Sequence, residues 1–128
     1  MPLKAYQSMN AYKLFMMDVG LLGALSELPA EAILEGNDIF VEFKGALTEQ
    51  YVLQQMISDT PYTPYYYGTD KGTFEQDFLI QKERNIVPIE VKAEGNLRSQ
   101  SLKAYCEKFH PNMAVRLSAL KYKDQDWM

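Results

Sequence analysis

The sequence has 128 residues, the usual length of one domain, which excludes two independent hydrophobic cores. Asp and Glu outnumber Lys and Arg by 17 to 13, so the overall charge offers no general attraction for a phosphate backbone, and any nucleic-acid contact has to come from a local patch. Cys106 is the only cysteine, which excludes an intrachain disulfide and a cysteine-cluster metal site and favours a reducing, cytoplasmic setting.

The N-terminal part lacks the apolar core of a signal peptide, and no later stretch approaches the roughly 20 apolar residues of a membrane span. Tyr12–Phe15 is predicted to be a short strand. Val19–Leu25 is predicted to be a short helix, with Asp18 as its N-cap. We expect residues 1–36 to form an extension that packs on a core of residues 37–128.

A long helix is predicted to begin near Asn37 and to end near Asp59. Its apolar residues recur at spacings of three or four or their sums, as on a helix that packs on one side. These residues are Phe40, Phe43, Leu47, Tyr51, Val52 and Met56.

A meander of three strands is predicted to follow this helix, because aromatic and β-branched residues alternate with turn-forming residues. The strands are Tyr65–Tyr67, Phe74–Gln81 and Ile86–Ala93, and the polar turn Lys82–Asn85 joins the last two. The pattern predicts two antiparallel pairs.

The C-terminal part is predicted to contain a helix over Leu97–Phe109 and a short strand over Ala114–Leu117. A helix between two strands permits a parallel crossover connection. The expected fold class is therefore α/β, with an αβββαβ order and a mixed sheet flanked by helices.

An acidic cluster with one lysine is predicted on this sheet. Glu90 and Lys92 are two apart on one strand, so their side chains project from the same face. Asp77 lies on the strand before it and can face Glu90 across the ladder. Two carboxylates about 4 Å apart repel by roughly 4 kcal/mol at an effective dielectric of 20, so a cation or a proton is expected to relieve the repulsion. Glu49, on the long helix, can complete the cluster.

This constellation resembles the spaced acid, aspartate and E-x-K signature of the PD-(D/E)XK phosphodiesterase superfamily, whose core has the same αβββαβ order. The resemblance implies that Asp77, Glu90 and the backbone carbonyl of Val91 are ligands of Mg²⁺ or Mn²⁺. It implies that Lys92 is the catalytic lysine and that Glu49 is the helix acid, binding the metal directly or through water. The implied activity is metal-dependent hydrolysis of DNA, with RNA a less favoured substrate.

A closer resemblance covers nearly the whole chain. The segments KLFMMDVGLLGAL, GALTEQYVLQQM, EQDFLIQ and VPIEVKA are similar to the uncharacterised C-terminal domain of prokaryotic AAA-type P-loop ATPases. This resemblance implies an N-terminal ATPase module as the partner, and the start MPLKAY is expected to come from the middle of a longer polypeptide. The chain has no GxxxxGK[ST] motif, so no ATP site is expected in it, and an oligomer is compatible with the pattern.

A second function stays open, in which the same fold is a non-catalytic interaction or regulatory module of the ATPase.

One spacing departs from the RecB-like nuclease branch, which carries Q-x-x-x-Y after E-x-K. Here Tyr105 follows Gln100 one position later.

Three other features have ordinary structural explanations. The tyrosines at 62 and 65–67 can stack bases, but edge-strand packing is favoured. Scattered lysines and arginines of the C-terminal half can form a basic rim, but solubility is the favoured explanation. The single histidine, His110, is assigned no role. The residues of the basic rim are Arg98, Lys103, Lys108, Lys121 and Lys123.

Overall fold

The computed structural model describes residues 2–36, 38–69, 74–93 and 99–122. The chain forms two compact units, each with its own secondary structure. The first unit comprises Met1–Lys13 and Pro61–Met128, and the second comprises Leu14–Thr60. No helix in the described ranges is long and apolar enough to cross a membrane.

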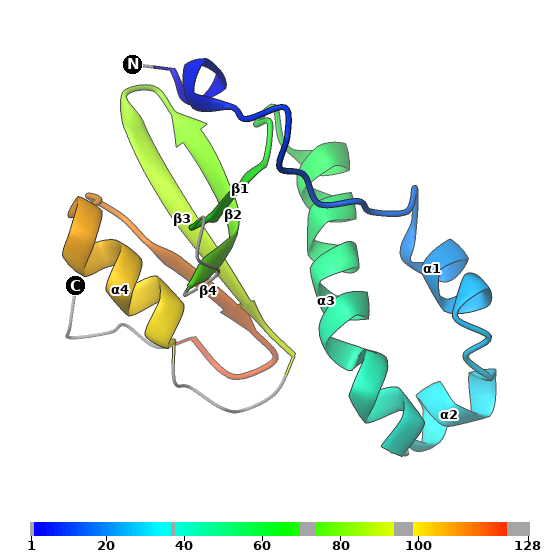
Figure 1. Cartoon of the computed structure of the whole chain (residues 1–128). Helices are drawn as coiled ribbons and strands as arrows, with labels where there is room; N and C mark the ends of the chain where they lie inside the picture. Colours follow the sequence, from blue (N-terminus) through cyan, green and yellow to red (C-terminus); the bar gives the residue numbers. More distant parts are fainter. Residues whose placement is uncertain (1, 37, 70–73, 94–98, 123–128) are drawn as a thin grey trace. The chain divides into compact units, whose positions relative to one another are not determined.

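The first unit is built on a four-stranded mixed sheet with the order β1-β2-β3-β4 (Figure 1). β1 pairs antiparallel with β2 and β2 with β3, whereas β3 and β4 are parallel. The predicted meander, the parallel last strand and the mixed α/β class are thereby confirmed. The strands are β1 (Tyr65–Gly68), β2 (Glu75–Lys82), β3 (Asn85–Lys92) and β4 (Val115–Ser118).

Helix α4 (Gln100–Phe109) packs against β2 and β3 and connects β3 to β4 (Figure 1). The helix buries Leu102 and Tyr105. The Tyr105 ring meets the Tyr67 ring edge-on, with 5.4 Å between the centroids. Since Tyr67 pairs with Gln76 of β2, α4 covers the face of the sheet that carries Gln76.

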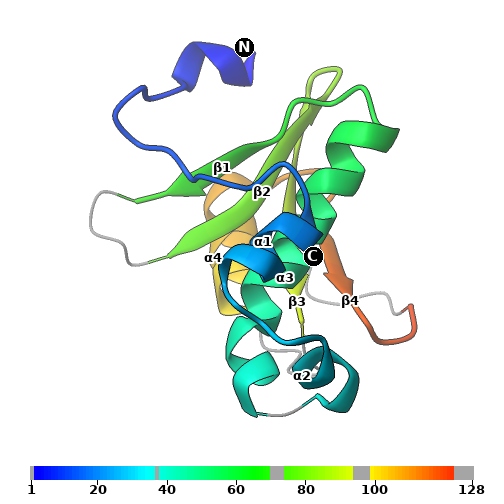
Figure 2. The same cartoon turned by 90° about the vertical axis from the view of Figure 1, so that its right-hand side faces the viewer.

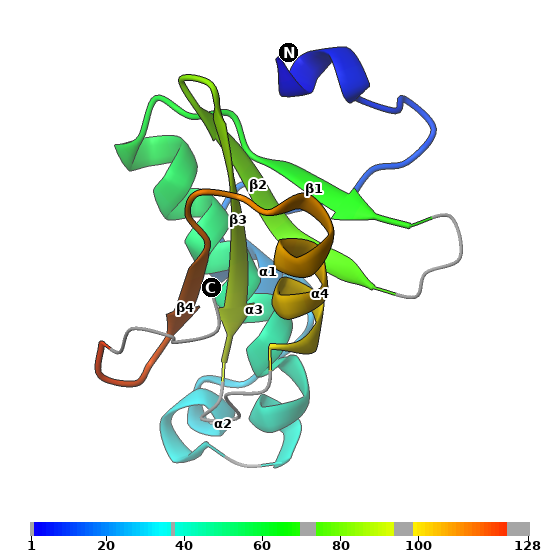
Figure 3. The ribbon, with the colours of Figure 1, turned by 90° about the vertical axis from the view of Figure 1, so that its left-hand side faces the viewer.

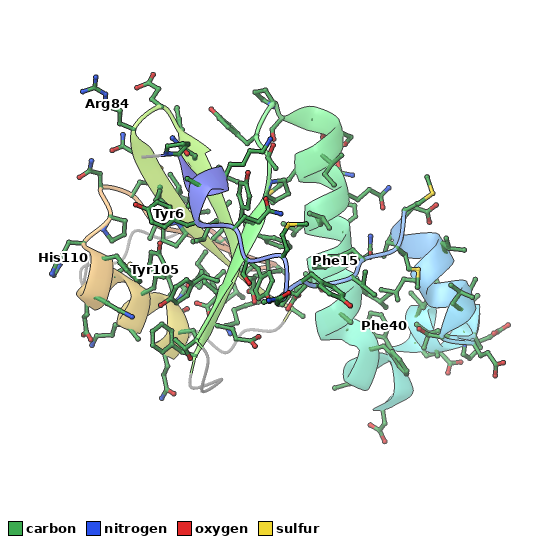
Figure 4. All side chains as sticks on the ribbon, turned by 45° about the horizontal axis from the view of Figure 1, so that its top comes forward. Tyr6, Phe15, Phe40, Arg84, Tyr105 and His110 are labelled. Atoms are coloured by element: carbon green, nitrogen blue, oxygen red, sulfur yellow. The ribbon has the colours of Figure 1, made fainter. Side chains whose placement is uncertain are left out.

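The predicted start of this helix, at Leu97 and Arg98, lies outside the described residues. The helix ends at His110, which adopts a left-handed conformation (φ 47°). The His110 side chain points away from the strands, as does that of Arg84 at the turn between β2 and β3 (Figure 4). Neither residue has a place in the site described below.

The second unit consists of three helices, of which α1 and α2 pack on α3. They are α1 (Val19–Leu25), α2 (Ala30–Glu35) and α3 (Asp38–Asp59). α1 and the long helix α3 were predicted, and Asp18 caps α1 as expected, its carboxylate accepting the N–H of Leu21 at 2.7 Å. α2 was not predicted. It ends at Gly36, whose φ of 64° suits a residue without a side chain.

The strand predicted over residues 12–15 is wrong, because this segment is irregular. Side chains of α3 satisfy the backbone that follows it. The buried Gln50 side chain accepts the N–H of Met16 at 2.9 Å and donates to the Met16 carbonyl at 2.8 Å. Gln54, one turn later, accepts the N–H of Val19 at 2.9 Å. Two glutamines of α3 thus satisfy the backbone of Met16 and Val19, which follow this segment.

Candidate functional site

The ladder between β2 and β3 stops before either strand ends. The last pair in register is Phe78 with Ile89. Beyond it, β2 pairs with β1, through Gln76 and Glu75, and β3 pairs with β4, through Glu90 to Lys92. The ribbons of β2 and β3 separate at this end of the sheet (Figures 2 and 3). A fork therefore forms where the predicted acids lie.

Asp77 lies at the start of this fork, on β2. Its carboxylate accepts the backbone N–H of Val91 at 2.7 Å, across the gap between the strands. Burial raises the pKa of Asp77 above its ordinary value of 3.8, while the Val91 N–H and the ammonium groups of Lys13 and Lys92 lower it. The charge of Glu90 raises this pKa further. The charges of both predicted residues of β3, Glu90 and Lys92, therefore act on the Asp77 carboxylate.

Glu90 and Lys92 form an ion pair on β3, with 2.8 Å between Lys92 Nζ and Glu90 Oε1. The side chain of Glu90 is 5% exposed and that of Lys92 34% exposed, so the pair leads from the interior to the surface. Glu90 Oε2 is buried and has no hydrogen-bond partner. A buried carboxylate oxygen without a partner is costly, and a cation beside it would remove that cost.

The side chains of this cluster suit a hard divalent cation only as a site with two carboxylate ligands, completed by water. Within the described residues, no group of three or more His, Cys, Asp or Glu side chains is arranged to hold a metal. Mg²⁺, however, is commonly held by one or two carboxylates with water. Asp77 and the unsatisfied Oε2 of Glu90 fit that pattern. The backbone N–H of Val91 donates to Asp77. That the backbone carbonyl of Val91 is a metal ligand stays a prediction.

Glu49, the predicted helix acid, lies on α3 in the second unit and is partly buried. Its membership of the site stays a prediction. The three strand residues lie together within the first unit, which also contains the start of the chain.

Lys13 was not predicted, yet it is a charged neighbour of Asp77. Its ammonium lies 5.8 Å from the centroid of the Tyr66 ring on β1. Nothing in the local pattern of residues 12–15 signals this role, because the contact joins distant parts of the chain. The E-x-K motif identifies only the lysine of β3.

Tyr67 and Lys108, two of the other residues singled out in the sequence, contact each other and α4. Tyr67 packs against Phe74, Tyr105 and Phe109, which supports the packing explanation for that tyrosine. Lys108 donates a hydrogen bond to the Tyr67 hydroxyl at 3.2 Å and lies 5.0 Å from the Phe109 ring centroid. Within the predicted basic rim, Arg98 and Lys123 lie outside the described residues.

The profile of one protein family matches residues 44–127, about two thirds of the chain, and this family is described as a domain of unknown function, DUF4143. The matched region includes all four strands, α4 and most of α3. No curated protein matches the sequence, and no solved structure matches the fold.

Proposed function

The chain belongs to the DUF4143 family, and we propose that its forked sheet carries a metal-dependent phosphodiester-hydrolysing site of the PD-(D/E)XK type. DNA is the proposed substrate. The observation that carries the proposal is the bond from Val91 N–H to Asp77, which fastens one acid beside a buried glutamate and its partner lysine.

In this proposal, Asp77 and Glu90 hold Mg²⁺ or Mn²⁺, which when bound would lower the pKa of a water molecule and polarise the scissile phosphate. The Val91 N–H fixes the Asp77 carboxylate, so little rearrangement is required of that acid. Lys92 orients the attacking water or stabilises negative charge as it develops on the phosphate. Its partial exposure allows the ammonium to reach a substrate from solvent.

The parent protein, in this proposal, is a prokaryotic AAA-type ATPase whose N-terminal P-loop module regulates the nuclease-like domain. The sequence resemblance supports that partner. The chain has a formal net charge of −4, so the positive surface for DNA has to be local or supplied by the ATPase module.

The direct test is cleavage of supercoiled plasmid DNA with Mn²⁺ and with EDTA. Asp77→Asn and Lys92→Met are expected to lose metal-dependent cleavage, because each removes a charge that the reaction uses. Lys82→Met is the matched control, because Lys82 is exposed at the opposite end of the β2–β3 hairpin. Cleavage that survives in Asp77→Asn would assign the activity to a contaminant or another site.

A second candidate function, a non-catalytic regulatory module of the ATPase, is favoured by one observation. The Glu90–Lys92 ion pair and the Val91 N–H already compensate much of the buried charge without a metal. This function predicts that substitutions of Asp77 or Lys92 change stability and ATPase regulation while wild-type protein cuts no nucleic acid. Purified wild-type protein that cleaves DNA with Mn²⁺ rules it out.

A further inference from the structure

A β-bulge lies in β2 at Asp77, on the side that pairs with β1. The register of the β1–β2 ladder shifts at this point. One residue of β1, Tyr66, stands between two registered pairs, whereas two residues of β2, Asp77 and Phe78, stand between the same pairs. Two residues that oppose one residue form a β-bulge. The registered pairs on either side are Tyr65 with Leu79 and Tyr67 with Gln76.

The bulge coincides with the end of the ladder on the other side of β2. Phe78 is the last residue of β2 in register with β3, opposite Ile89. In a regular ladder Asp77 would come next, opposite Glu90, and its side chain would stand perpendicular to the sheet. Instead, the Asp77 carboxylate accepts the backbone N–H of Val91 at 2.7 Å. Because ladder N–H groups lie in the plane of the sheet, this carboxylate has turned into the gap between the strands.

An extra residue in one strand accounts for this turn of the Asp77 side chain. A bulge bends its strand, ends regular pairing and redirects the side chains beside it. Phe78 is 2% exposed, so the core holds one end of the bulge, and the bend falls on Asp77. The ribbons of β2 and β3 separate at the same end of the sheet (Figures 2 and 3). All of these residues belong to the first unit.

We propose that the Asp77–Phe78 bulge is the positioning element of the candidate metal site: Phe78 anchors β2 in the core, and the bend directs the Asp77 carboxylate to the Val91 N–H. This inference rests on the proposed function, because Asp77 is a proposed metal ligand. Loss of the groups that orient a ligand commonly weakens metal binding by about 10- to 100-fold. Removal of the bulge should therefore weaken the site although every charged residue is kept.

The test inserts one threonine between Tyr66 and Tyr67, so that β1 offers a partner to each residue of the bulge. The control is a threonine inserted between Thr63 and Pro64, in the irregular segment before β1. Both variants are made in the full chain and compared with the wild type. Interstrand NOEs of Tyr66 show whether it opposes one residue of β2 or two.

The Val91 amide proton reports the hydrogen bond directly. In the wild type and the control it should lie downfield, because its acceptor is a carboxylate, and move upfield as Asp77 is protonated at acid pH. In the variant with one-to-one pairing, both the downfield position and this titration should be lost. Calorimetric titration with Mn²⁺ alone should show a Kd raised by about tenfold or more.

The wild type provides a check that needs no variant. NOEs from Tyr66 to both Asp77 and Phe78 are expected, and one-to-one pairing in the wild type overturns the proposal. If the inserted threonine is accommodated beyond Gly68 and Tyr66 still opposes two residues, the Val91 signal should stay as in the wild type. Its loss in that case would contradict the link between the bulge and the hydrogen bond.

The outcomes separate this inference from the nuclease proposal. If the variant has one-to-one pairing but binds Mn²⁺ and cleaves DNA as the wild type does, the positioning role is wrong and the nuclease proposal stands. If the Val91 signal depends on the bulge while the wild type neither binds Mn²⁺ nor cleaves DNA, the bulge directs Asp77 and the nuclease proposal is wrong. A Val91 signal that is independent of the bulge, in a wild type without metal binding or cleavage, overturns both.

Discussion

The Asp77 carboxylate accepts the backbone N–H of Val91 at 2.7 Å, so an acid of β2 is fastened to the strand that carries Glu90 and Lys92. This bond lies just beyond the last registered pair of the β2–β3 ladder. The carboxylate thus satisfies a strand amide that the ladder no longer serves. It also keeps the acid close to the ion pair of β3.

Asp77 is expected to lower stability at neutral pH. Burial raises its pKa above 3.8, so the folded state holds the proton more strongly than the unfolded state. Stability then falls as the pH rises from 3.8 through the raised pKa and stays lower above it. Asp77→Asn keeps an acceptor for the Val91 N–H but cannot ionise. The melting temperature of Asp77→Asn, minus that of the wild type, should therefore be higher at neutral pH than below pH 3.8.

The control for this prediction is Asp59→Asn, at an exposed aspartate that ends α3. Melting curves of the two variants and wild type across the acid range provide the comparison. The same pH-independent shift in both variants would show that burial of Asp77 has no such effect.

A divalent cation should stabilise the wild type. Binding to the folded state alone raises the free energy of unfolding by about 2.7 kcal/mol at a concentration one hundred times the Kd. Mn²⁺ should therefore raise the melting temperature of the wild type, and EDTA should reverse the change. Asp77→Asn should show little of it, because one of two carboxylates is lost. Equal shifts in both proteins would place the metal elsewhere.

The Glu90–Lys92 pair should show strong energetic coupling. Lys92→Met leaves a buried carboxylate without its partner and should cost about 1–3 kcal/mol. Glu90→Gln in the same chain should recover part of that loss, with a coupling of about 1 kcal/mol or more in a double-mutant cycle. The exposed pair Lys103–Glu107, at 3.9 Å, is the control and should couple by less than about 0.5 kcal/mol.

The two glutamines of α3 should protect different backbone amides. Gln50→Leu removes both hydrogen bonds to Met16 and should cost about 2 kcal/mol, since each bond contributes about 1 kcal/mol. Hydrogen exchange at the Met16 amide should accelerate. Gln54→Leu should accelerate exchange at Val19 instead. If either variant accelerated exchange equally at both amides, the segment would open as one unit, and separate protection by the two glutamines would be wrong.

Most of the fold was predictable because most of its strands and helices have a local signal. The periodicity of α3, the Asp18 cap and the hairpin between β2 and β3 all lie within short windows of sequence. The predicted strand over residues 12–15 was wrong because strand propensity is a weak local signal, and this segment is irregular in the structure. The short helix α2 was missed because six residues provide too little periodicity.

The candidate site divides in the same way. The spacing of Glu90 and Lys92 and the short turn to β2 predict which side chains share a region. The bond from the Val91 N–H to Asp77 forms just beyond the point where the β2–β3 ladder stops, and no local pattern specifies that point. The partnerless oxygen of Glu90 is likewise visible only in the structure. The roles of backbone groups and of residues from distant segments could therefore be identified only from the structure.

The most direct measurement of the central claim is anomalous diffraction from crystals of the wild-type chain soaked in Mn²⁺, with Asp77→Asn crystals treated alike. The account predicts an anomalous peak beside the carboxylates of Asp77 and Glu90 in the wild type, and its loss in the variant. A wild-type crystal at saturating Mn²⁺ with no peak at these two residues would contradict a metal-dependent site at the fork.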